Sequence, residues 1–142
     1  MLSDKYKYEV EFSCSEHDFW RFNLFMIVVG YNGAGERVSF DDLTDRVYEL
    51  EYGEQERTAP PGYSDLRSAV ITTGDCAYVE IYVYAVANTL PASVLIKDTP
   101  SFPARLKVTA DNLTVIDHEY TVNPWGGLTI VALRADARDL RQ

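Results

Sequence analysis

Apolar and polar residues alternate along several stretches of this 142-residue chain, and this alternation constrains the fold more than any other feature of the sequence. In residues 5–12, tyrosine, valine and phenylalanine alternate with lysine and glutamate. The same period of two recurs in residues 77–87 and 105–110. This period is that of a β-strand with one buried face and one solvated face. It therefore predicts a fold built mainly from half-buried strands.

Further candidate strands are separated by turn signals. Residues 22–30 form a continuous apolar stretch, which indicates a strand buried on both faces. The pair Asp111-Asn112 lies between two alternating stretches and predicts a hairpin turn. The full series of expected strands is 5–12, 22–30, 69–73, 76–87, 93–97, 106–110, 113–122 and 128–133.

Residues 39–52 fit two patterns. Ser39, followed by Asp42 three residues later, resembles a helix N-cap. Phe40, Leu43 and Val47 recur at helical spacing, whereas the tyrosines and glutamates of 48–52 alternate as in a strand. We therefore expect a short helix over 40–46 that leads into a strand over 47–52.

Seven or eight short strands with at most one helix predict a mainly all-β protein, folded as a single antiparallel β-sandwich over residues 1–142. We expect Val79, Ile81 and Val83 inside it, packed against Leu106, Val108 and Ile130. The length fits one domain. The pattern resembles an immunoglobulin-like or C2-like sandwich in general terms, although no motif of either family is present.

The formal charge is −9, which argues against nucleic acid as a partner, because binding phosphates needs clustered lysine and arginine. The first residues do not resemble a signal peptide, and the longest apolar run, 24–29, is too short for a transmembrane helix. We therefore expect either a cytoplasmic protein or an exported domain that has been trimmed.

Acidic residues are densest between positions 41 and 56. This segment is interpreted as a solvated surface, with a Ca²⁺-dependent binding site or a docking surface for a basic partner as alternatives. No calcium-binding loop motif is present, and Arg46 interrupts the run. The acidic residues are Asp41, Asp42, Asp45, Glu49, Glu51, Glu54 and Glu56.

No motif predicts catalysis or a cofactor. Asp117-His118-Glu119 is the densest titratable cluster, but on a strand His118 points away from its two acidic neighbours, so we expect it to be partly buried. His17 lies in a polar turn and should be exposed. Cys14 and Cys76 are expected to be buried free thiols, with a disulfide between them as the alternative.

Tyrosines on the strand 76–87 are the strongest functional signal. Opposite its aliphatic face this strand carries Tyr78, Glu80, Tyr82 and Tyr84, where a solvated strand usually carries Thr, Lys and Glu. Either the proline-rich loop near residues 60–63 covers them, or they bind a ligand. Tyrosine is favoured at interfaces because it offers a large, stiff contact area with a polar tip. Trp125 is a second candidate binding residue.

The sequence thus favours a non-enzymatic interaction module that binds a protein partner, or itself, through the tyrosine-bearing sheet face. A carbohydrate-binding module is the first alternative, with sugar rings stacked on the same tyrosines and on Trp125. The second is a Ca²⁺-dependent binding domain that uses the acidic segment 41–56.

Overall fold

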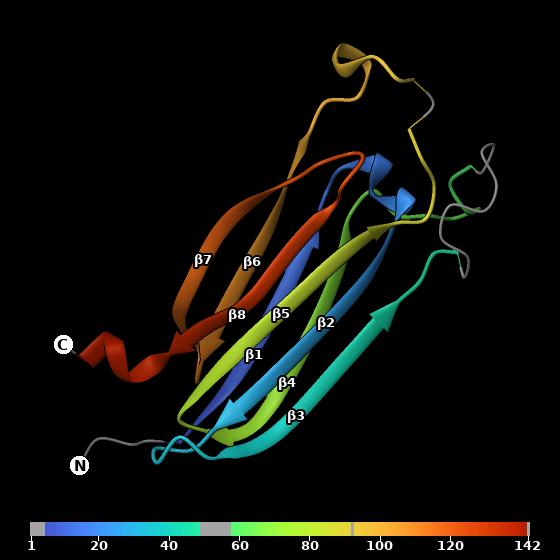
Figure 1. The fold of residues 1–142 in the computed structure, drawn as a ribbon. Helices are drawn as coiled ribbons and strands as arrows, with labels where there is room; N and C mark the ends of the chain where they lie inside the picture. Colours follow the sequence, from blue (N-terminus) through green and yellow to red (C-terminus); the bar gives the residue numbers. More distant parts are fainter. Residues whose placement is uncertain (1–4, 49–57, 92, 142) are drawn as a thin grey trace.

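The computed structural model describes residues 5–48, 58–91 and 93–141 and shows two four-stranded antiparallel sheets packed face to face (Figure 1). One sheet has the strand order β4-β1-β6-β7 and the other β3-β2-β5-β8. The predicted antiparallel β-sandwich is therefore confirmed.

The described part of the chain contains eight strands and three short 3₁₀ helices. The strands are β1 (Tyr6–Cys14), β2 (Phe22–Tyr31), β3 (Arg37–Asp45), β4 (Arg67–Cys76), β5 (Tyr78–Ala87), β6 (Phe102–Ala110), β7 (Leu113–Val122) and β8 (Leu128–Asp136). The 3₁₀ helices are η1 (His17–Arg21), η2 (Ile96–Asp98) and η3 (Ala137–Arg141).

Most connections cross from one sheet to the other. Only the β2–β3 and β6–β7 connections join neighbours in one sheet. The first strand, β1, lies inside its sheet and pairs with β4 on one side and β6 on the other. As a result, Val10 pairs with Val108, far along the sequence.

The core lies between the two sheets and follows the alternation of the sequence. Tyr8 and Val10 of β1 are fully buried, as is Leu106 of β6. The opposite sheet contributes Leu24, Met26, Val79, Ile81 and Val83, also fully buried. The residues predicted to pack together, including Val108 and Ile130, belong to this one cluster.

Two local predictions are wrong, and a third fails for its first two residues. Residues 40–45 lie in strand β3, not in a helix, because pairing with β2 places Leu43 beside Met26 at the edge of the core, and Arg46 follows the end of the strand. Residues 93–97 are not a strand, because the Ser93 hydroxyl accepts the Leu95 N–H and the segment turns into η2. The expected strand 47–52 is absent at Val47 and Tyr48, and its remainder lies outside the described residues.

The two cysteines are buried free thiols, as predicted, and the disulfide alternative is wrong. Cys14 pairs across β4 with Arg67, whereas Cys76 pairs with Tyr6, so the thiols lie at opposite ends of the β1–β4 pair. Eight residues of extended strand separate them by roughly 27 Å. Burial raises the pKa of both thiols.

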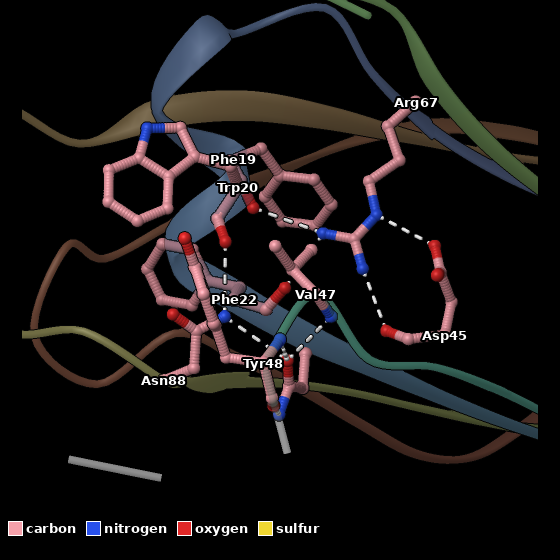
Figure 2. Close-up of polar contacts among 9 residues, drawn as sticks. Phe19, Trp20, Phe22, Asp45, Val47, Tyr48, Arg67 and Asn88 are labelled. Atoms are coloured by element: carbon pink, nitrogen blue, oxygen red, sulfur yellow. Dashed lines mark hydrogen bonds and ion pairs between the residues drawn. The ribbon is translucent and has the colours of Figure 1, made fainter. Parts of the chain in front are cut away.

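A buried arginine ties η1, β2 and β3 to the start of β4 (Figure 2). The Arg67 guanidinium donates to the Phe19 and Phe22 carbonyl oxygens at 3.0 and 2.7 Å and to the Asp45 carbonyl oxygen at 2.8 Å. Its Nε lies 2.9 Å from the Asp45 carboxylate, and the group sits over the Phe19 ring. The buried charge of Arg67 therefore has a structural role: it holds these four segments together.

Two asparagines, Asn23 and Asn88, anchor the chain beyond β3, and Asn88 is labelled in Figure 2. Asn23 Oδ1 accepts the Val47 N–H at 3.0 Å, and Asn23 Nδ2 donates to the Tyr48 carbonyl oxygen at 2.7 Å. Asn88 donates to Asn23 Oδ1 and to the Trp20 carbonyl oxygen. These bonds pair backbone groups that no sheet partner reaches at this end of the sandwich.

Candidate functional site

The outer side of the β3-β2-β5-β8 sheet is made mostly of aromatic and aliphatic side chains. We call this surface the aromatic face. No described strand or 3₁₀ helix crosses it (Figure 1). Its apolar members are Phe25, Ile27, Val29, Tyr31, Phe40, Tyr78, Tyr82, Tyr84, Val86 and Val131.

Register across β2 and β5 places these side chains in rows. Phe25 lies opposite Tyr84, Ile27 opposite Tyr82, and Tyr31 opposite Tyr78. Directly opposed residues on one face contact each other, so each row is a cross-strand pair. All of these side chains except Val29, which is buried, keep part of their surface exposed. Residues 22–30 were predicted to be buried on both faces, and for Phe25 and Ile27 that prediction is wrong.

The two outer strands extend the same surface. Phe40 of β3 lies opposite Val29 and is 57% exposed. Val131 of β8, 62% exposed, belongs to a bulge opposite Tyr82, where Ala132 has a φ of 51°. A bulge bends an edge strand and re-aims its side chains, here toward solvent.

The outer side of the other sheet is chemically different. It carries ordinary charged residues, and Arg105 pairs with Asp117 across β6 and β7. That pairing lowers the pKa of Asp117. Its charged residues include Lys7, Glu9, Glu11, Asp75, Arg105, Lys107, Asp117 and Glu119. One side of the sandwich is therefore suited to water and the other is largely apolar.

The proline-rich loop does not cover the predicted tyrosines. Tyr63 closes a turn with Pro60, and its ring meets His17 of η1 edge-on, with 6.0 Å between ring centroids. His17 is exposed, as predicted, and contacts Asp65 at 2.7 Å. This loop therefore lies beside η1 and the start of β4, and the interpretation in which it covers the tyrosines is wrong for the described residues.

Tyr78 is held in place from both neighbouring strands. The Tyr31 ring of β2 stacks on it at 5.0 Å between centroids with an interplanar angle of 12°. From the β8 side, the Arg134 guanidinium lies 4.2 Å from the ring centroid. Tyr78 is thus a fixed part of the aromatic face, with little ring surface left for a ligand.

Glu80 is also engaged within the sheet. Its carboxylate accepts a 2.5 Å hydrogen bond from the Tyr31 hydroxyl. This bond is the main reason why the pKa of Tyr31 is raised to about 12. Tyr82 and Tyr84, which no such contact covers among the described residues, are the predicted site residues best placed to meet a partner.

A buried carboxylate lies at the same corner of the sheet. Asp136 accepts hydrogen bonds at 2.8 Å from both Arg134 and Arg138. Burial acts to raise the pKa of Asp136, but the two arginines outweigh it and lower the pKa to about 2. This ion cluster fixes the Arg134 side chain beside Tyr78.

Trp125 lies apart from the aromatic face. It occupies the turn between β7 and β8, where Asn123 Oδ1 accepts its backbone N–H at 2.8 Å. Its side chain is 40% exposed. The structure therefore does not bring Trp125 and the tyrosines of β5 together on one strand face.

The acidic segment is spread out on β3. Asp41 and Asp45 share one side of the strand with Leu43, Asp42 points to the other, and Asp45 pairs with Arg67. Within residues 5–48, 58–91 and 93–141, no three His, Cys, Asp or Glu side chains gather as a metal site would need. The glutamates at 49–56 lie outside the described residues.

His118 was predicted to be partly buried, and this is wrong. It faces the core side of β7 beside Tyr120, with 4.5 Å between ring centroids, but it is exposed because β7 is an edge strand. Its acidic neighbour Asp117 is engaged by Arg105 on the opposite side of the strand.

A cavity of about 200 Å³ lies at the end of the sandwich near η1 and η2. Phe22, Phe102 and three prolines form its apolar walls, and Arg21 is the basic residue in its lining. Its other lining residues are Glu16, Asp18, Ser93, Asp98, Thr99 and Ser101. It is separate from the aromatic face, whose members do not line it.

Comparison of this chain with protein-family models, curated proteins and solved structures finds no significant match. Among the helices that the structure describes, none is long and apolar enough to cross a membrane.

Sequence reasoning found the β5 contribution to the aromatic face and missed that of its neighbours. Phe25 and Ile27 lay in a run that looked wholly buried, and Phe40 was placed in a helix. An available signal was the alternation of Phe40 and Asp42 with Ser39 and Asp41, which a strand would place on opposite sides.

Proposed function

We propose that this protein is a non-enzymatic interaction module that binds another polypeptide through the aromatic face. The observation that carries this proposal is the partly exposed group of Tyr82, Tyr84, Phe25 and Ile27 at the centre of one sheet, where Arg46 lies over the Phe25 ring. Contiguous exposed apolar patches of this kind mark interaction sites in soluble proteins. An immunoglobulin-like character of the sandwich stays a prediction from its general pattern.

Two features of the face suit a protein partner. Tyrosine and phenylalanine contribute large contact areas at low entropic cost, and tyrosine is enriched at interfaces. The contacts of Tyr78 with Tyr31 and Arg134 hold part of the face rigid before binding. A rigid surface loses less conformational entropy when it binds.

The carbohydrate alternative has less support. Tyr78 is covered from both sides, Glu80 accepts the Tyr31 hydroxyl, and Trp125 lies in a separate turn. A sugar platform needs free ring faces with free carboxylates or amides beside them. The calcium alternative has no cluster of acidic ligands among the described residues.

Photo-crosslinking tests the proposal. A benzophenone side chain is placed at Tyr84 on the aromatic face or, as a control, at Thr121 on the outer side of the other sheet. We expect position 84 to form covalent adducts with another polypeptide. An excess of unlabelled wild-type protein should suppress these adducts, whereas an excess of the unlabelled Tyr82→Glu variant should not. Equal adduct patterns from the two positions would contradict the proposal.

A further inference from the structure

We infer that the partner of the aromatic face is a second copy of this chain, related to the first by a two-fold axis parallel to the strands. This inference rests on the proposed function and names its partner. Charge, size and strand order on this face carry the argument.

Charge separates this face from the rest of the molecule. The chain has a formal charge of −9, so most of its surface would attract a basic partner. On and around the aromatic face, however, three acidic side chains stand against four basic ones, a net charge of only +1. They are Asp42, Glu80 and Asp136 against Arg37, Arg46, Arg134 and Arg138. A nearly neutral, apolar surface is matched by another of the same kind, and this chain supplies one.

The area of the face is close to what a dimer needs. Four strands about 4.8 Å apart, each about nine residues long, give a face of roughly 20 Å by 30 Å, or about 600 Å² before side-chain relief is counted. A standard interface buries about 800 Å² of accessible surface on each partner. The aromatic face alone therefore approaches the size that a stable homodimer needs.

Strand order makes the face complementary to itself. A two-fold axis parallel to the strands lays β3 of each copy over β8 of the other, because these two strands are the opposite edges of the sheet. The β3 edge presents Arg37, Asp42 and the protruding Phe40, and the β8 edge presents Arg134, Asp136 and the protruding Val131. Each edge thus carries both signs of charge, so the arrangement brings no edges of one sign together, and its centre is formed by Ile27 and Tyr82.

Sedimentation equilibrium tests self-association. We expect wild-type protein to shift from monomer to dimer between about 1 µM and about 1 mM, and Tyr82→Glu to weaken the dimer at least about tenfold, or about 1.4 kcal/mol. Thr121→Glu, the same charge on the outer side of the other sheet, should leave the dimer unchanged. A wild-type monomer throughout, or equal effects of the two variants, would overturn the inference.

The sign of the salt effect is a second test. Two copies of charge −9 repel at long range, so added NaCl should tighten the homodimer. Weakening of the wild-type dimer by salt would contradict association through a nearly neutral face.

Cysteine crosslinking tests the orientation. Phe40→Cys and Val131→Cys each place a thiol at an exposed position, while the native Cys14 and Cys76 are buried. A mixture of the two variants should form a mixed disulfide faster than either variant alone forms its own. Preferential pairing of Phe40→Cys with itself would show that β3 meets β3 and would overturn the two-fold arrangement described.

The two proposals fail separately. The wild-type protein could stay monomeric and still form adducts from position 84 that unlabelled protein suppresses. That result would contradict the homodimer and support an interaction module with a different partner. A monomer without such adducts would reject both.

Discussion

The Tyr8 hydroxyl joins three segments that are distant in sequence. It donates to the Ala77 carbonyl oxygen at 2.7 Å and accepts the Ala137 N–H at 2.8 Å, all within the core. Burial is the main reason why the pKa of Tyr8 is raised to about 12. Tyr8→Phe leaves two buried backbone groups unpaired, and we expect it to lower the free energy of unfolding by about 1–3 kcal/mol in urea titrations.

Tyr6→Phe is the matched control for this prediction. Tyr6 lies on the same strand and the same side, with its ring edge-on to Tyr8 at 6.2 Å. No hydrogen bond of its hydroxyl to a described residue is seen, so its removal should change stability little. Equal losses in the two variants would contradict the linking role of the Tyr8 hydroxyl.

The lowered pKa of Asp136 predicts that its contribution to the stability of the fold is lost in acid. Its pKa falls from 3.8 in the unfolded chain to about 2 in the folded one, so the ionised form stabilises the fold. This contribution is complete above about pH 4 and is lost as the pH falls toward about 2. Asp136→Asn should therefore be less stable than wild type at neutral pH, and unfolding curves should converge near pH 2. A constant gap from neutral pH to pH 2 would contradict this assignment.

Among the described glycines, Gly127 in the β7–β8 turn leaves the least room for a side chain. Gly127 has a φ of 73°, and a Cβ there would lie 1.9 Å from the Ala85 carbonyl oxygen. Gly62 has a similar φ of 78° with open space around it. In thermal unfolding, Gly62→Ala should cost about 1 kcal/mol, from the backbone alone. Gly127→Ala should cost about 1–3 kcal/mol more, because Ala85 must move. Equal losses would show that the turn can relax.

Element by element, period two was a reliable guide where one face is buried. The strand at residues 5–12 and the β6–β7 hairpin were predictable because most apolar residues there fall on one side, although a bulge at Val115 interrupts the alternation in β7. β3 was not, because it is an edge strand whose core-facing side carries Ser39, Asp41 and Asp45 around a single leucine. Because little of β3 is buried, its alternation of apolar and polar residues is weak. The cap-like Ser39 and Asp42 and the helical spacing of the apolar residues therefore favoured a helix in the sequence-based prediction.

At the scale of the whole molecule, strand order is what the sequence did not reveal. The tyrosines of β5 were recognisable from their own strand, but Phe25, Ile27, Phe40 and Val131 join them only through pairing of β3, β2, β5 and β8. Pairing depends on long-range register, which local pattern does not encode. A binding face shared by four strands is therefore found in pieces from the sequence and assembled only in three dimensions.

The same long-range pairing predicts slow folding. β1 must meet β6, and Tyr8 pairs with Ala110 across most of the chain. Because such loops must close before their contacts form, sandwich proteins fold in about milliseconds to seconds. Stopped-flow refolding should give relaxation times in this range, and folding in microseconds would contradict the pairing order described.

The central position of β1 has a consequence during synthesis on the ribosome. The hairpin β2–β3 can close soon after it emerges, but one edge of β1 waits for β6, which begins at Phe102. At translation rates of about 5–20 residues per second, β1 spends roughly 5–20 s with that edge unpaired. Nascent chains released before β6 therefore expose a strand with an open edge and an apolar face. Such truncated products should require chaperone binding or degradation to keep them from aggregating.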